Sequence, residues 1–276
     1  MIKFLVDSAS DCNKDSPTID YFMPVTINID SKEYKSGIEL DSDRFYELQA
    51  TAKEFPKTSQ PSPQDFVDVF EEVKEAGDEL ICFLISSALS GTCQGANIAK
   101  EMVDYDGIYI IDTLSATHLI GILAEYAREL RENGLSADEI VEKCETLKSK
   151  IKVLAGVDTL EYLYKGGRMS RATAAVGSLA NIKPILTVTP EGRVEAVGKA
   201  IGKGRAIQFI IDKIPLNELD ENFPMYSIYS SGTENVTALE EKLEAEGISV
   251  KERLQIWPAI GAHTGPGVYG IIFVTK

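Results

Sequence analysis

The segment LICFLISSALSGT, residues 80–92, is the clearest indicator of the fold class. Its first six residues, Leu80–Ile85, form an unbroken apolar run, as expected of a strand buried on both faces. Hydroxyl-bearing residues follow, and a helical pattern comes after them. Apolar runs at Ile2–Val6 and Tyr109–Ile111 lead into turns or helices in the same way. This alternation predicts an α/β fold whose N-terminal part has a mainly parallel sheet, with helices on both faces.

The pattern changes after about Leu154. Two apolar runs, Ile185–Val188 and Val194–Val197, flank a Pro-Glu-Gly turn and predict a hairpin. Helical stretches alternate with further apolar runs up to the C-terminus, which predicts an α+β part with a mixed sheet. At roughly 150 residues per domain, 276 residues suggest two domains. We expect them at residues 1–155 and 156–276, with the chain able to cross between them.

Composition excludes several classes of protein. The formal net charge of −15 repels phosphate backbones, so we expect no nucleic-acid partner. No stretch approaches the ~18 apolar residues of a membrane helix, so no integral membrane segment is expected. Four cysteines without a C-x-x-C pair favour a reduced, cytoplasmic setting. With only two histidines, a multi-histidine metal site is improbable.

Two hydroxyl-rich segments precede helices. Ser86–Thr92 comes after the strand at Leu80–Ile85, where open α/β sheets bind ligands and where free backbone N–H groups suit an anion. Lys57–Pro61 supplies two more hydroxyls before the helix whose cap is Ser62. The simpler alternative for both segments is that their hydroxyls only cap helices.

Two further segments combine glycine with charged or titratable side chains. Gly261–Gly267 reads as a loop rich in glycine and proline around His263, which can donate to a carboxylate. Lys165–Arg171 carries three cations in an otherwise acidic chain, and arginine suits carboxylate or phosphate. The alternatives are a surface histidine in a turn and a solvated loop. Gly202–Arg205 is a second small basic loop with the same ambiguity.

Common enzyme motifs are missing or incomplete. No G-x-G-x-x-G follows a strand, and the segment at Gly198–Lys203 has the wrong spacing for a phosphate loop. Gly91–Gly95 imitates a nucleophile elbow with Cys93 in place of serine, but Cys93 falls inside the expected helix. An esterase or thioesterase that uses Cys93 or Ser90 with His263 stays open as an alternative. A regulatory or structural module is a third.

Seven segments together resemble the DegV family of bacterial fatty-acid-binding proteins, in the family's order. They are Val6–Asp11, Thr58–Ser62, Ser86–Thr92, Asp158–Leu163, Lys165–Arg168, Asn181–Leu186 and Gly261–Gly267. The resemblance implies a two-domain DegV-like fold that holds one long-chain fatty acid in a buried apolar tunnel. It also implies a carrier without catalysis or cofactor of its own.

The same resemblance implies roles for residues and partners. Thr58, Ser90 and His263 would bind the fatty-acid carboxylate. Ser59, Gly91 and Arg168 would lie near the head group, and Arg171 and Arg205 would contact the phosphate or the kinase. A separate fatty acid kinase subunit would bring ATP and magnesium. An acyltransferase in phospholipid synthesis would then use the acyl-phosphate. Cys93 and Val268 depart from the family's usual residues, which leaves the preferred acyl chain open.

Overall fold

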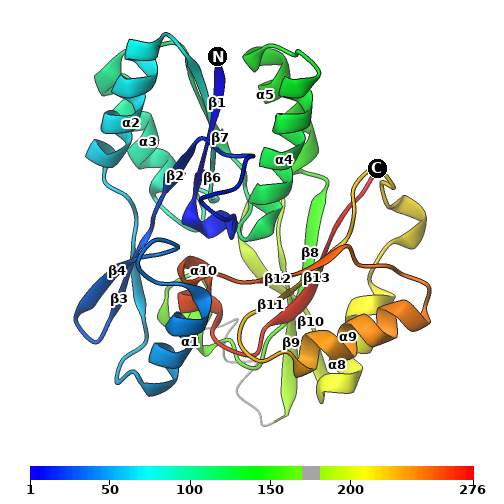
Figure 1. The fold of residues 1–276 in the computed structure, drawn as a ribbon. Coiled ribbons are helices and arrows are strands. Elements are labelled where there is room, and N and C mark those ends of the chain that lie inside the picture. Colours follow the sequence, from blue (N-terminus) through cyan, green and yellow to red (C-terminus); the bar gives the residue numbers. More distant parts are fainter. Residues whose placement is uncertain (170–180) are drawn as a thin grey trace.

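The N-terminal sheet consists of parallel strands in the order β2-β1-β6-β7 (Figure 1). These strands span Tyr21–Met23, Ile2–Asp7, Glu79–Leu84 and Ile108–Asp112. The computed structural model describes residues 1–169 and 181–276. The apolar run at Leu80–Ile85 lies in the middle of this sheet, as its unbroken apolar character predicts.

Helices cover both faces of this sheet because successive side chains of a strand point to opposite faces. Leu5 and Leu80 pack with Phe66 on one face, whereas Phe4 and Phe83 belong to the core on the other. The helices are α2 (Pro63–Ala76) and α3 (Thr92–Val103) on one side, and α4 (His118–Glu132) and α5 (Ala137–Lys148) on the other. The parallel sheet with helices on both faces is confirmed.

The C-terminal sheet is mixed, as expected, with strand order β10-β9-β8-β13-β11-β12. The strands span Val194–Ile201, Ile182–Val188, Ile151–Gly156, Tyr269–Val274, Tyr226–Tyr229 and Glu252–Gln255. Only β11 and β12 pair in parallel within this sheet. Strands β9 and β10 form the predicted hairpin. The expected domain division after residue 155 falls inside β8, which belongs to this sheet.

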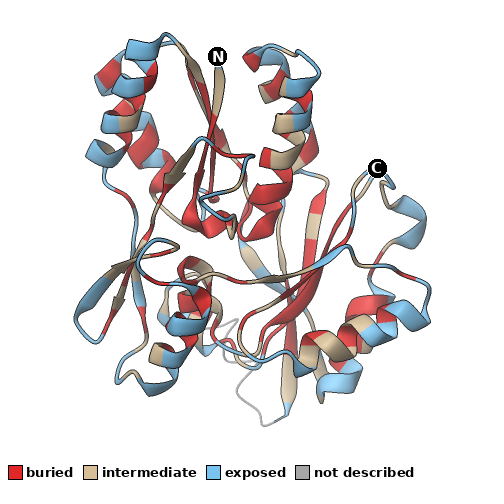
Figure 2. Cartoon of the chain, viewed as in Figure 1, coloured by how far each residue is buried: buried red, intermediate tan, exposed pale blue. Residues whose placement is uncertain are grey.

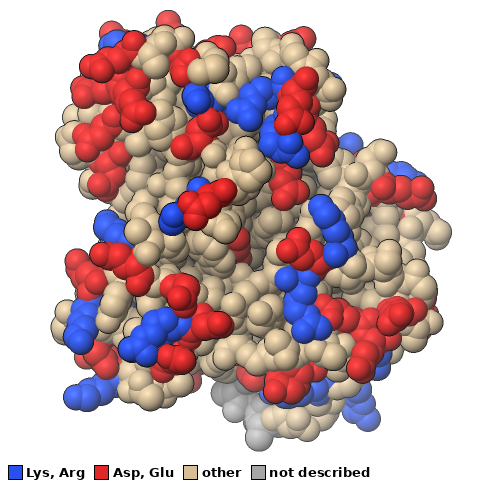
Figure 3. Space-filling model, viewed as in Figure 1, with Lys and Arg blue, Asp and Glu red and all other residues tan. Residues whose placement is uncertain are grey.

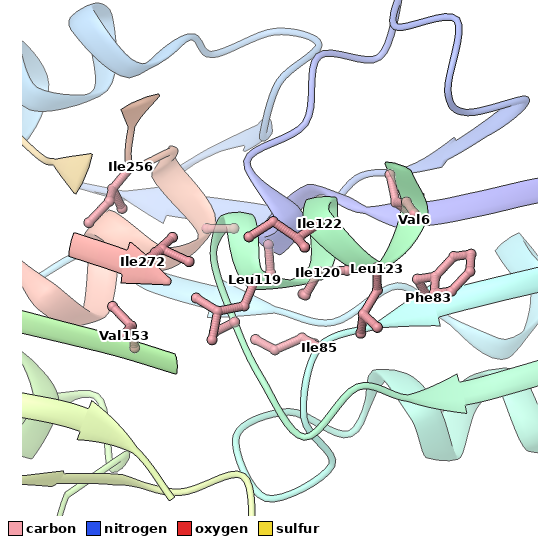
Figure 4. Packing of buried hydrophobic residues seen from close by; sticks show 14 of the residues in the cluster. Val6, Phe83, Ile85, Leu119, Ile120, Ile122, Leu123, Val153, Ile256 and Ile272 are labelled. Carbon is pink, nitrogen blue, oxygen red and sulfur yellow. The ribbon is translucent and has the colours of Figure 1, made fainter. Parts of the chain in front are cut away.

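The two sheets share one apolar core. Helices α8 (Lys203–Asp212) and α9 (Glu234–Ala245) cover one face of the C-terminal sheet. The other face contributes Val153 and Ile272 to the core that contains Leu119 and Ile120 of α4 (Figure 4). Figure 2 shows this buried band running from one lobe into the other. The lobes therefore pack directly against each other.

A small antiparallel sheet lies beside both lobes. Its strands are β4 (Lys32–Lys35), β3 (Thr26–Ile29) and β5 (Lys57–Ser59), in the order β4-β3-β5. The sequence of residues 21–29 favours a single strand, but the structure divides this segment into β2 and β3. The chain breaks at Pro24, which lacks an N–H to donate, and β2 and β3 join different sheets.

The described ranges also contain shorter helical segments. They are the 3₁₀ turns Ser8–Ser10 and Leu216–Glu218, and the helices α1 (Ser42–Thr51), α6 (Glu161–Lys165) and α10 (Pro258–Thr264). Helix α1 contacts the C-terminal part through Tyr46, whose hydroxyl donates to Ile256 O at 3.0 Å. No helix in the described ranges is long and apolar enough to cross a membrane. Figure 3 shows acidic side chains spread widely over the visible face, in keeping with the net charge of −15.

Candidate functional site

A small apolar cavity lies at the carboxyl ends of the parallel strands. Ala9, Ile85 and Ala116 follow β1, β6 and β7 and line it, as the rule for open α/β sheets predicts. Its volume is about 60 Å³. The remaining lining residues are Val25, Thr58, Leu89, Ser90, Leu163, Arg168, Val194, Ala259, Ile260, His263 and Thr264. The polar ones among them come from four of the segments that we singled out by sequence, whereas Gly202–Arg205 contributes none.

Thr58 and His263 are in direct contact, although 205 positions separate them in the chain. Thr58 Oγ1 lies 2.8 Å from His263 Nε2. Thr58 projects from β5, and His263 lies in the last turn of α10. Our expectation that His263 sits in a loop was wrong, because Pro258 starts a short helix that ends at Thr264, with Gly265 as its C-cap. Proline fits the first turn of a helix, where its missing N–H has no partner to lose.

His263 is held as a neutral ring. Burial, and to a lesser extent the nearby charge of Arg168, lower the pKa of His263 to about 4. Within the part of the chain that the structure describes, its Nδ1 has no hydrogen-bond partner. A Cβ on Gly166 would lie only 2.2 Å from this Nδ1, so the glycine backbone packs against the ring. This role of Gly166 was not predicted from the sequence, although Gly166 and Gly167 are adjacent in the basic segment.

Ser90 lines the cavity at the start of α3. Its Oγ lies 2.8 Å from Thr92 Oγ1, and Gly91 is the N-cap residue. The free N–H groups of a helix N-terminus favour a negative charge, so this end of the cavity suits a carboxylate. Gln60 packs over Gly91, and its Nε2 donates to Gly91 O at 3.2 Å.

Arg168 connects the basic segment to the serine-rich segment. Its Nε donates to Leu89 O at 2.9 Å, and its Nη1 donates to Gly166 O at 2.5 Å. Burial lowers the pKa of Arg168, which still leaves the guanidinium charged. It is the cation among the residues known to line the cavity.

The other predicted site residues lie elsewhere. Ser59 is exposed, and as the neighbour of Thr58 in β5 it points to the opposite face of the strand. Arg205 is exposed in the first turn of α8 and does not line the cavity. Arg171 lies outside the described residues.

The groups required for a hydrolase are not arranged for catalysis. Cys93 lies in α3, where burial raises the pKa of its thiol to about 12. Its Sγ donates to Ile85 O, not to a base. Ser90 pairs with Thr92, whereas His263 pairs with Thr58. Neither proposed nucleophile therefore has His263 as its partner in this structure. In the described ranges, no group of three His, Cys, Asp or Glu side chains is placed to hold a metal ion.

The whole chain matches one protein family. The model described as "Uncharacterised protein, DegV family" matches residues 1–276. The chain is 36% identical to the DegV domain-containing protein TTE1491 of Caldanaerobacter subterraneus subsp. tengcongensis, over all of this chain and 99% of the relative. This protein belongs to the DegV family. The resemblance drawn from seven short segments is thus confirmed over the full length.

Solved structures agree with the family membership. A DegV family protein from Thermus thermophilus, described for its fatty acid binding, superposes with a TM-score of 0.88 at 34% identity. It covers 100% of this chain and 99% of its own. DegV from Bacillus subtilis, a fatty acid binding protein, has a TM-score of 0.85 at 29% identity, with 100% and 99% covered. The two-domain DegV-like fold is therefore confirmed for this DegV-family chain.

Proposed function

We propose that this DegV-family chain binds one long-chain fatty acid and presents its carboxylate to a separate ATP-dependent fatty acid kinase. The observation that carries the proposal is the meeting of Thr58, Ser90, His263 and Arg168 around one apolar cavity. Two proteins with the same fold, 34% and 29% identical, are described as fatty acid binding. The chain itself would act as a carrier and supply no catalytic group.

The polar end of the cavity fits a carboxylate held by neutral donors. A hydroxyl from Thr58 and one from Ser90 can each donate to an anion, and the neutral His263 ring can share the hydrogen bond of Thr58. Arg168 adds a positive charge at the cavity, and its Nε and Nη1 donate to the backbone oxygens of Leu89 and Gly166. A head group bound in this way keeps its oxygens available for phosphoryl transfer.

The apolar walls fit an acyl chain, provided that the cavity widens. Its volume of about 60 Å³ is well below the roughly 300–1,000 Å³ of common small-molecule sites. We expect the acyl chain to displace apolar side chains between the lobes as it enters. Burial of about fourteen methylenes at about 0.8 kcal/mol each provides roughly 11 kcal/mol before the costs of ordering and displacement.

The chemical step would occur on the bound carboxylate. A carboxylate oxygen attacks the γ-phosphorus of ATP, the bond from that phosphorus to the bridging oxygen breaks, and acyl-phosphate and ADP result. The kinase would supply ATP and magnesium. Arg205, exposed on α8, and Arg171 are the proposed contacts for the phosphate or the kinase, and an acyltransferase would then consume the acyl-phosphate.

Mass spectrometry of the purified protein tests fatty-acid binding. Denaturing spectra should reveal a co-purified C14–C18 acid, or the delipidated protein should bind added palmitate or oleate. Ser90→Ala and Thr58→Ala should lower occupancy, because each removes a donor and little volume. Ser59→Ala is the matched control, since its hydroxyl points away from Thr58. A protein that neither carries nor binds a fatty acid would overturn the proposal, as would equal occupancy in all variants.

A kinase assay tests the partner contact. Arg205→Ala should reduce kinase-coupled turnover more than it reduces fatty-acid binding. Arg44→Ala, an exposed arginine on α1, is the control for loss of surface charge. If Arg205→Ala abolished fatty-acid binding instead, the assigned contact would be wrong. Turnover of a chromogenic acyl ester that depended on Cys93 or Ser90 would favour the hydrolase alternative.

A further inference from the structure

The segment Val6–Asp11 contains two carboxylates, Asp7 and Asp11, close to the candidate site but outside its lining. Neither Asp7 nor Asp11 is among the described residues that line the cavity. Asp7 is fully buried, and its two oxygens accept from Ala9 N and from Ile85 N, both at 2.8 Å. Asp7 therefore joins the ends of β1 and β6.

Asp11 joins the two lobes. Its Oδ1 accepts a hydrogen bond from Trp257 N at 3.0 Å, and its Oδ2 accepts one from the hydroxyl of Thr117. Thr117 is the N-cap residue of α4 in the N-terminal lobe, and Trp257 is the N-cap residue of α10. The Asp11 side chain thus connects the N-cap residues of two helices, and these two residues are 140 positions apart in the sequence.

Both helix starts lead directly to the cavity. Ala116, which precedes Thr117, lines it, and α10 contributes Ala259, Ile260 and His263. A shift of α10 relative to α4 would therefore change the width of the cavity. It would also change the distance from His263 to Thr58, because Thr58 lies on the separate strand β5.

The backbone around this connection is strained. Thr117 has φ 57° and ψ −157°, a conformation that β-branched residues rarely adopt. Asp11 itself is left-handed, with φ 55° and ψ 20°, which aspartate and asparagine tolerate better than most residues. Such conformations persist only where surrounding contacts hold them, and the hydrogen bond from Thr117 to Asp11 is one such contact.

We propose that Asp11 is a positioning residue of the fatty-acid site: its two hydrogen bonds fix α10 against the start of α4, and so hold His263 within reach of Thr58. The proposal rests on the proposed function for the identity of the ligand. The hydrogen bonds of Asp11 and the contact of His263 with Thr58 are present without a bound ligand.

Two substitutions at Asp11 can separate the effect of its hydrogen bonds from the effect of its charge. A hydroxyl can donate or accept, so Asp11→Asn can keep both contacts, with its oxygen accepting from Trp257 N and its amide donating to Thr117. Asp11→Gly keeps the freedom to adopt positive φ but loses both contacts. The pair therefore separates the loss of the connection from backbone strain and from loss of charge.

NMR titration of the delipidated protein tests the positioning directly. In the unsubstituted protein the pKa of His263 should lie near 4. In Asp11→Gly it should rise toward 6.5, because His263 would leave its buried place. In Asp11→Asn it should stay near 4. An unchanged pKa in Asp11→Gly, or an equal rise in both variants, would overturn the proposal whether or not the protein binds a fatty acid.

Oleate binding by the same variants completes the test. We expect at least tenfold weaker binding in Asp11→Gly and a change of less than threefold in Asp11→Asn. Ser136→Ala removes the cap of α5, away from the cavity, and controls for a general loss of stability. Weakening in Ser136→Ala equal to that in Asp11→Gly would contradict a positioning role. Failure of the unsubstituted protein to bind oleate would instead contradict the proposed function.

Discussion

At the scale of single residues, the candidate site depends on a histidine without charge. His263 has one nitrogen 2.8 Å from Thr58 and the other against the backbone of Gly166. Burial and Arg168 disfavour its protonated form, so the ring is neutral at pH 7. A neutral ring orients the Thr58 hydroxyl without neutralising a bound carboxylate. The arrangement therefore favours a head group that keeps its negative charge.

Loading with a fatty acid should raise the pKa of His263 from about 4. A carboxylate placed beside the ring stabilises the imidazolium form, and an opposite charge raises the pKa of a base. NMR titration of delipidated and oleate-loaded protein measures the shift. His118 is the only other histidine and serves as the internal reference. Equal pKa values for His263 in the two states would place the carboxylate elsewhere.

At the scale of elements, the site depends on how closely α6 approaches α10. Gly166 ends α6, and its lack of a side chain lets the backbone contact the His263 ring. Its backbone has φ −75° and ψ −7°, so alanine would be tolerated by the local conformation. The constraint at this position is therefore the distance between two helices and not the shape of the chain.

Gly166→Ala should weaken fatty-acid binding on the order of tenfold, or about 1.4 kcal/mol. The added Cβ would fall 2.2 Å from Nδ1 and must displace the ring from Thr58. A fluorescent fatty-acid titration measures the affinity. Gly204→Ala in α8 is the control: no atom lies within 4 Å of its Cβ, so binding should persist and stability should rise by up to about 1 kcal/mol. Normal affinity of Gly166→Ala would mean that the ring position does not matter.

At the scale of the whole molecule, one core joins both lobes, and the imidazole ring of His118 lies at the edge of this core. His118 starts α4 and packs edge-on against Tyr226 of the C-terminal sheet, with ring centroids 5.0 Å apart. Neither ring nitrogen has a hydrogen-bond partner among the described residues. Burial, and then the charge of Lys251, lower the pKa of His118 to about 4.

His118 should make the free energy of unfolding fall as the pH decreases from about 6.5 to 4. In this window the unfolded chain binds a proton at His118 and the folded protein does not, so acid favours unfolding. The full effect is at most about 3 kcal/mol. Burial raises the pKa of Asp7 to about 6, which works in the opposite direction over part of the same window.

Denaturant unfolding at several pH values can isolate the contribution of His118. The free energy of unfolding of His118→Asn should fall less with acid than that of the unsubstituted protein, because about one proton fewer is taken up on unfolding. The comparison between the two proteins cancels the contribution of Asp7. Parallel curves would show that His118 titrates alike in both states.

Local patterns in the sequence predicted most of the elements. The apolar run at Leu80–Ile85 predicted β6, the cap at Ser62 predicted α2, and the Pro-Glu-Gly turn predicted the hairpin of β9 and β10. All three are present. The predicted helix after Ser62 has the full capping box, with Asp65 as its partner. These features depend on neighbours within one or two turns, so a single sequence contains them.

The site could be predicted only in its parts. Thr58 and Ser90 lie in hydroxyl-rich segments and His263 lies in a glycine-rich segment. The family resemblance assigned all three residues to one site. Their assignment as carboxylate ligands stays a prediction. The short α10 was missed because glycine and proline dominate its segment, and the packing of α10 against α1 and α6 supports a helix that local propensity disfavours.

The fold class could be predicted from the sequence, because the strand and helix periods and the caps are properties of adjacent residues. The packing of the lobes, by contrast, brings Thr58 to His263, leaves no room for a side chain at Gly166 and places Asp11 between α4 and α10. Each of these contacts joins different elements of the chain, and all of them join residues more than 90 positions apart. Such contacts follow from how the lobes pack together, and no local pattern records that packing.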